Sequence, residues 1–124
     1  MKIKVYERAI ELILSCPDKD LKKLRVVNIA QAIAANRSYL SRCFKKALGM
    51  SVTEFVRREK IHRAVFILDK DHDKTIEILA SELGFHHVDD FIAEFEKRLA
   101  IHPERYRYLR KNRNFIQAER YGNR

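Results

Sequence analysis

The chain has 124 residues, of which 46% are hydrophobic, and its formal net charge is +9. This length suits one ordinary domain with a buried core, and no apolar run is long enough to cross a bilayer. The N-terminus lacks a signal-peptide pattern, so we expect a cytoplasmic protein without membrane contact. The cationic excess favours a polyanionic partner.

The N-terminal third predicts two helices separated by a polar segment. Apolar residues at helical spacing place the first helix at about residues 2–15, and Pro17 lies just past its end. Residues 18–25 are mostly charged and are expected to form a polar link. The second helix is expected at about residues 26–34, with its apolar positions turned toward the core.

Capping residues mark the starts of the next two helices. Asn36 is a favourable N-cap for a helix at about residues 37–48, and Gly49 ends that helix. The sequence Ser-Val-Thr-Glu at 51–54 has the spacing of a capping box. It therefore predicts the start of a long helix at about residues 52–68.

The last third predicts three more helices and a tail. The helices are expected at about residues 76–83, 87–99 and 103–111. Thr75 suits the N-cap of the first of them, Gly84 the turn before the second, and Pro103 the first position of the third. No segment alternates with the period of a strand, so the predicted fold is all-α with about seven helices.

The apolar pattern of residues 29–55 recurs at residues 79–106, so that Phe44 aligns with Phe95. An internal repeat is a strong signal of organisation, and each copy reads as a short helix, a turn and a second helix. The chain is thus expected to form a first helix-turn-helix subdomain, a linker helix, a second helix-turn-helix subdomain and a basic tail, at about residues 1–50, 52–68, 75–111 and 112–124.

The two copies differ in charge. Residues 29–49 contain four Lys or Arg and no acid, whereas residues 76–99 contain six acids against two cations. The second helix of such a unit fits the DNA major groove, and a basic one also meets phosphate. The first copy is therefore predicted to read DNA. Three outcomes are open for the second copy: it reads unusual bases, it does not contact the DNA, or it serves as a protein-contact face. Weak or absent DNA contact is favoured.

Several motifs resemble the DNA-binding domain of AraC/XylS-type bacterial transcription regulators. They include Tyr39-Leu40-Ser41-Arg42-x-Phe44-Lys45-Lys46, Gly84-Phe85, Phe91-x-x-x-Phe95 and Pro103-x-x-Tyr106-Arg107. The resemblance covers about residues 5–110 and implies one DNA-binding domain with two helix-turn-helix units joined by a long helix. It also implies transcription regulation through double-stranded DNA, with RNA polymerase as a partner. Many family members carry a separate sensing or dimerising domain, and none is visible in this sequence.

The resemblance also carries over site residues by position. Base-reading positions fall at Arg37, Ser38, Ser41 and Arg42. Arg42 can chelate guanine O6 and N7, and the serines can form short, permissive hydrogen bonds with bases. Contacts with the DNA backbone are expected from Tyr39, Lys45, Lys46, Ser51, Thr53, Arg57, Arg58 and Lys60. If the second copy touches DNA, its contacting positions are His86, His87, Val88 and Asp89.

Other chemistries have little support in the sequence. His86 and Asp90 are four residues apart, but no third ligand accompanies them, so no metal site is predicted. Cys16 and Cys43 lack the CxxC spacing of a zinc site. No catalytic arrangement or phosphate-binding glycine loop stands out, so we expect neither an enzyme nor a cofactor. The rival to DNA binding is a protein-interaction module that uses the acidic second repeat.

Overall fold

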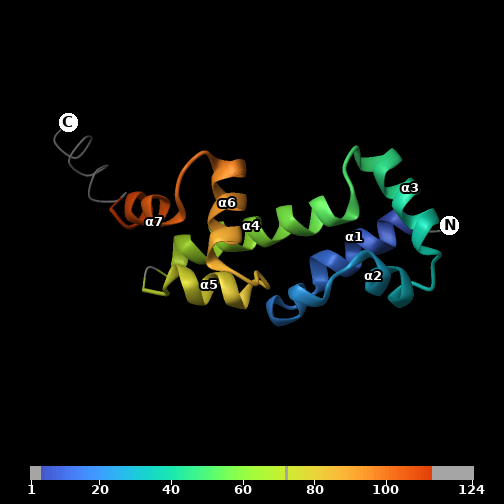
Figure 1. Cartoon of the computed structure of the whole chain (residues 1–124), viewed down its shortest axis with the longest axis horizontal. Helices are drawn as coiled ribbons and strands as arrows, with labels where there is room; N and C mark the ends of the chain where they lie inside the picture. The colour runs from blue at the N-terminus through green and yellow to red at the C-terminus, as the bar shows by residue number, and fades with distance from the viewer. Residues whose placement is uncertain (1–3, 72, 113–124) are drawn as a thin grey trace, which may run out of the picture. The chain divides into compact units, whose positions relative to one another are not determined.

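The computed structural model describes residues 4–71 and 73–112 (Figure 1). Its helices are α1 (Val5–Ser15), the 3-10 helix η1 (Asp18–Lys23), α2 (Val26–Ala32), α3 (Arg37–Leu48), α4 (Val52–Lys70), α5 (Ile76–Glu82), α6 (Val88–Leu99) and α7 (Pro103–Lys111). No strand occurs in these two ranges, and the predicted all-α class is confirmed. The predicted basic tail lies outside the described residues except for Asn112.

The segment predicted to be a polar link instead forms η1. The N–H of Asp20 donates to the Pro17 carbonyl at 3.0 Å, and the N–H of Leu24 donates to the Leu21 carbonyl at 3.1 Å. Leu21 is only 1% exposed and anchors the segment in the core. One buried leucine among charged neighbours has no periodic pattern, so the sequence alone did not predict this element.

The chain divides into two compact units. Among the described residues, the first unit holds 4–60 and 82–84, and the second holds 61–71, 73–81 and 85–112. Helix α4 supplies its residues up to Lys60 to the first unit and its later residues to the second.

The first unit is built around α1, α2 and α3, which pack against one another (Figure 1). Its core contains Ile13, Ile29, Leu40 and Phe44, all fully buried. The ring of Phe44 meets the edge of Phe55 with centroids 5.5 Å apart. Burial of each large apolar side chain contributes about 1.5–3 kcal/mol, which holds α3 against α1 and α2 without using its outward residues.

The second unit has an aromatic core. Phe91 and Phe95 of α6 are fully buried, and their ring centroids lie 5.8 Å apart. Phe85 packs against Phe91 with centroids 5.3 Å apart, and Tyr106 of α7 packs against Phe95 at 5.7 Å. Such tilted and edge-on pairs add to the area term because the ring edge is positive and the ring face negative.

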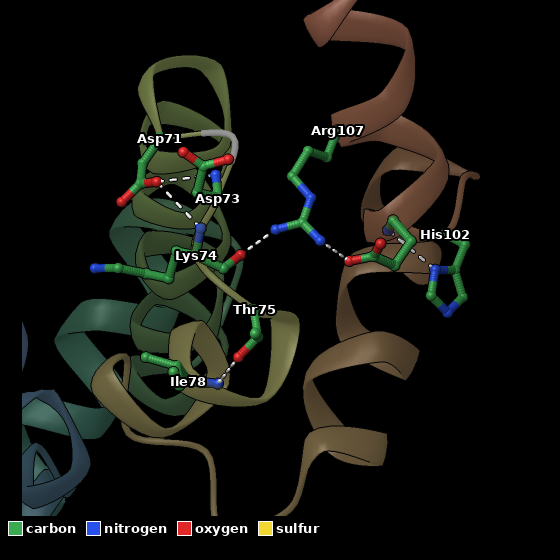
Figure 2. A network of polar contacts seen from close by, with 8 residues as sticks. Asp71, Asp73, Lys74, Thr75, Ile78, His102 and Arg107 are labelled. Atoms are coloured by element: carbon green, nitrogen blue, oxygen red, sulfur yellow. Dashed lines mark hydrogen bonds and ion pairs between the residues drawn. The ribbon is translucent and has the colours of Figure 1, made fainter.

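Polar contacts fix α7 to the segment between α4 and α5 (Figure 2). The Arg107 guanidinium donates to the Lys74 carbonyl and forms an ion pair with Glu104. The Asp71 carboxylate accepts from the N–H of Lys74 at 3.1 Å, which orders the segment that presents this carbonyl. Asp69 accepts from the Tyr106 hydroxyl at 3.0 Å and from Arg110 Nε at 2.8 Å.

Candidate nucleic-acid interface

Helix α3 begins and ends where the sequence predicts. Asn36 Oδ1 accepts a hydrogen bond from the N–H of Tyr39 at 3.0 Å, which satisfies one of the four N–H groups that a helix start leaves without a partner. Gly49 follows the helix with φ +73°, and its N–H donates to the Lys45 carbonyl at 2.8 Å. The two ends set the length of the 12-residue helix, and the burial of Leu40 and Phe44 sets which face turns outward.

Two of the predicted base-reading residues, Ser38 and Arg42, lie on the outward side of α3, and Arg37 is exposed at the helix start. Leu40 and Phe44 are fully buried one turn apart, so positions on the opposite face reach solvent. Arg37, Ser38 and Arg42 are exposed, and Ser41 is half-buried. The structure therefore brings three of the four predicted residues to the surface as a group on one helix.

Cations continue along α3 to its end. Lys45 and Lys46 are both exposed and lie in its last turn. Positive charge is favourable at a helix C-terminus because the last carbonyls carry partial negative charge. The helix thus joins a possible reading surface with a cationic end suited to phosphate.

Tyr39 lies on one flank of α3 and is 52% exposed. A hydrogen bond with Cys43 raises the pKa of the Tyr39 hydroxyl above its ordinary value of 10.0, while the charge of Arg42 acts in the opposite direction. The hydroxyl therefore stays protonated at neutral pH. A neutral phenol can donate a hydrogen bond to a phosphate without repelling it.

The start of α4 carries the next group of predicted backbone contacts. Ser51 Oγ accepts from the N–H of Glu54 at 3.1 Å, which confirms its predicted capping role. Arg57 forms an exposed ion pair with Glu54 at 3.5 Å, and an exposed pair of this kind is weak enough to be exchanged for phosphate. Thr53 and Arg58 are exposed.

Lys60 has a role inside the fold. Its Nζ donates to the Gly84 carbonyl at 3.1 Å, and its side chain is half-buried. Burial lowers the pKa of the Lys60 ammonium from its ordinary 10.5, and the nearby charge of Arg57 lowers it further. Lys60 is one of the phosphate contacts predicted from the sequence. Its hydrogen-bond acceptor lies 24 residues away along the chain, so nothing in the sequence indicates this internal contact.

The predicted second-unit positions lie at the start of α6. His87 is the N-cap residue, His86, His87 and Asp89 are exposed, and Val88 is half-buried. Asp89 and Asp90 occupy the first turn, where carboxylates are favourable because the free N–H groups carry partial positive charge. These acids thus stabilise the helix and repel phosphate at the same place.

Sequence reasoning missed the contribution of α1. A groove of about 900 Å³ runs between the start of α1 and the flank of α3. Lys4, which precedes α1, and Arg8 of α1 line one side, and Tyr39 and Lys46 of α3 line the other. The four-residue spacing of Lys4 and Arg8 was the available signal, because it places both on one helix face.

The described part of the chain offers neither a metal-binding cluster nor a membrane-spanning helix. Within it, no group of three or more His, Cys, Asp or Glu could hold a metal ion. None of its helices is both long enough and apolar enough to span a membrane.

The chain is similar in sequence to known helix-turn-helix proteins. A family model described as a helix-turn-helix domain matches residues 29–108. A Bacillus subtilis protein named as an HTH-type transcriptional regulator, YfiF, is 32% identical over 102 residues, which cover 82% of this chain and 32% of that protein. The chain spans about a third of the length of three of the curated relatives it matches and 12% of a fourth.

Solved structures share the fold. A transcriptional regulator from Chromobacterium violaceum, described as containing an AraC-type DNA-binding domain, superposes with a TM-score of 0.76 at 22% identity over 86% of this chain and 91% of that one. The DNA-binding domain of AdpA, solved with a target DNA, superposes with a TM-score of 0.73 at 16% identity over 97% of this chain and 98% of that one.

Proposed function

This chain belongs to the AraC-type helix-turn-helix family, and from that membership we propose that it binds double-stranded DNA in a sequence-specific manner to regulate bacterial transcription. The observation that carries the proposal is the outward face of α3. It presents Arg37, Ser38 and Arg42 to solvent on a helix whose opposite face is fully buried.

In the proposed complex, α3 enters the major groove. The Arg42 guanidinium forms two hydrogen bonds with guanine O6 and N7, while Ser38 and Ser41 form short hydrogen bonds with neighbouring base edges. These contacts supply selectivity. Phosphate contacts supply most of the affinity and come from the cations at the end of α3 and the start of α4, namely Lys45, Lys46, Arg57 and Arg58.

The second unit has a lesser role in this proposal. The carboxylates of Asp89 and Asp90 face solvent at the start of α6, where a reading helix would approach phosphate. Repulsion from DNA makes close insertion of α6 unfavourable. We therefore assign the base reading to α3 and weak or no DNA contact to α6.

RNA polymerase is the proposed protein partner. This assignment rests on family resemblance and on the relatives whose names describe transcriptional regulators. Regulation by the intact protein would place this domain beside a promoter, where contact with the polymerase converts DNA binding into a change in transcription.

A salt titration tests the proposal. Affinity for duplex DNA should fall linearly on a plot of log affinity against log salt concentration, because bound cations release counterions. Substitution Lys45→Ala should weaken binding to all sequences alike and reduce the slope by about 1. The matched control is Lys97→Ala, which removes a cation from the last turn of α6 and should leave the slope unchanged.

Two results would count against DNA binding through α3. One is the absence of measurable binding at low ionic strength. The other is a slope that Lys45→Ala and Lys97→Ala change equally, which would mean that the cations of α3 have no special place. The first result favours the rival, a protein-interaction module whose contact face is the acidic second repeat. The second result would instead assign phosphate contacts to both units.

A further inference from the structure

We propose that the groove between α1 and α3 of one copy binds the acidic face of α6 from a second copy, so that the protein associates head to tail. This self-association goes beyond the DNA binding proposed above. It uses Lys4 and Arg8, which the proposed DNA interface leaves out, together with Tyr39 and Lys46, which that interface shares. Three features of the described residues support it: the lining of the groove, the pattern of α6 and the complementarity of their charges.

The groove combines apolar walls with a cationic rim. Val5 and Ala47 lie in its walls with the Tyr39 ring, and Lys4, Arg8 and Lys46 supply the charge. Lys4, Arg8 and Lys46 are exposed, and none of the described residues that line the groove is acidic. A bare phosphate would use the cations and leave the apolar walls in water. A helix that carries both carboxylates and an apolar centre would use both parts of the lining.

Helix α6 has the matching pattern on its solvent side. Phe91 and Phe95 are fully buried in the second unit, which fixes the opposite face outward. Asp89, Ala93 and Glu96 are exposed, and their spacing of four and three residues places them in one row on that face. The two carboxylates are about 10 Å apart along the helix at about 1.5 Å per residue. The small Ala93 between them allows close approach to an apolar wall.

The charges of the two surfaces are opposite. The groove carries three cations, from Lys4 just before α1, Arg8 of α1 and Lys46 of α3. The α6 row carries two carboxylates with Asp90 beside them, and these three acids outnumber the one cation of the row, Lys97. Opposite charges across an interface guide encounter and fix the register of the partners. The lining of the groove thus points to an acidic helix, and α6 is such a helix within the same molecule.

This contact pairs two different surfaces, so two copies joined by one such contact still leave one groove and one α6 unpaired. A copy whose groove is filled still presents its own α6, and a copy whose α6 is bound still presents its own groove. The net charge of +9 opposes association in free solution, so we expect a weak contact, with a Kd of about 0.1 mM at moderate salt.

Two alanine variants separate the two sides of the contact. Lys4→Ala with Arg8→Ala removes charge from the groove, and Asp89→Ala with Glu96→Ala removes charge from α6. Sedimentation equilibrium without DNA should show concentration-dependent association of the wild type, and each variant alone should associate about tenfold more weakly. Thermal unfolding of each variant confirms that it remains folded.

Mixing the variants gives the decisive result. The α6 variant retains an intact groove, and the groove variant retains an intact α6, so an equimolar mixture has one intact contact per pair. It should form heterodimers with an affinity close to that of the wild type and should not grow beyond them. Matched controls are Arg25→Ala with Arg105→Ala and Glu11→Ala with Glu77→Ala, which remove exposed charges elsewhere and should leave association unchanged.

The proposal is overturned if the wild type remains monomeric up to about 1 mM, well above the expected Kd. It is also overturned if the mixture associates no better than either variant alone. A third contrary result is unchanged self-association of the groove variant together with weakened DNA binding, which would make the groove part of the DNA interface. Because association is measured without DNA, failure here leaves the proposed reading by α3 untouched.

Discussion

At the scale of single residues, left-handed backbone positions reveal how the two copies are related. Ala34 (φ +54°) and Gly84 (φ +85°) occupy the same turn in the two copies, and Gly49 (φ +73°) and Ala100 (φ +58°) both follow the second helix. Each copy thus has one glycine and one alanine at its two left-handed positions, in opposite order. An alanine there costs about 1 kcal/mol because its Cβ crowds the following carbonyl.

The two alanines should therefore be replaceable by glycine with a gain in stability. We expect Ala34→Gly and Ala100→Gly each to raise the free energy of unfolding by about 0.5 kcal/mol, since relief of strain exceeds the added entropy of the unfolded chain. The control Ala47→Gly, at an exposed position inside α3, should lower it by about 0.5–1 kcal/mol. Denaturant unfolding curves give all three values, and a loss in all three would refute the strain argument.

The two glycines differ in their surroundings, which allows conformation and close approach to be separated. A Cβ built on Gly84 would lie 2.6 Å from the backbone nitrogen of Lys22, whereas a Cβ on Gly49 would meet nothing within 4 Å. Gly49→Ala should therefore cost about 1 kcal/mol from backbone strain alone. Gly84→Ala should cost about 2–4 kcal/mol because η1 must also move. Equal losses measured by chemical denaturation would contradict the close approach.

At the scale of elements, prediction succeeded where local sequence signals mark the start of a helix or both of its ends. The bounds of α3 and α7 match the predicted ranges because Asn36 and Gly49 enclose α3 and Pro103 opens α7. Helix α4 runs two residues farther than predicted, to Lys70, because no glycine or proline stops it. The His102 side chain, which accepts from the N–H of Glu104 at 3.0 Å, is an N-cap that the usual preferences do not indicate.

Contacts between distant residues explain what the sequence could not reveal about the elements. The hydrogen bonds from Tyr106 and Arg110 to Asp69 join positions 37 and 41 residues apart. They have no periodic pattern, because each depends on how α7 folds back on the end of α4. The groove was missed for the same reason, since its two sides come from α1 and α3.

The N-terminus of α3 offers a test at the element scale. Asn36→Ala removes the side-chain acceptor for the N–H of Tyr39 and should lower the free energy of unfolding by about 1 kcal/mol. Asn36→Asp keeps an acceptor and adds negative charge at the helix start, so stability should be retained. Thermal unfolding followed by circular dichroism measures both. Equal stability of Asn36→Ala and the wild type would mean that packing alone positions this end of α3.

At the scale of the whole molecule, charge is divided unequally between the two copies. The cationic residues of the first copy lie on the exposed part of α3, and the acids of the second lie at the exposed start of α6. The sequence predicted this division from composition, and the structure shows which of these side chains reach solvent. The sequence alone could not predict the hydrogen bond from Lys60 to the Gly84 carbonyl, because that bond depends on where Gly84 lies in the folded chain.

The central proposal is that Arg42 on α3 reads base edges, and selectivity measures this most directly. Binding sites are selected from random duplexes, and affinity for the enriched duplex is compared with affinity for random DNA at one fixed salt concentration. The wild type should prefer the enriched duplex by at least about 1,000-fold. Arg42→Ala should lose about 1–3 kcal/mol of that preference while retaining most of its affinity for random DNA. Equal binding of both duplexes by the wild type, or an unchanged preference in Arg42→Ala, would contradict the proposal.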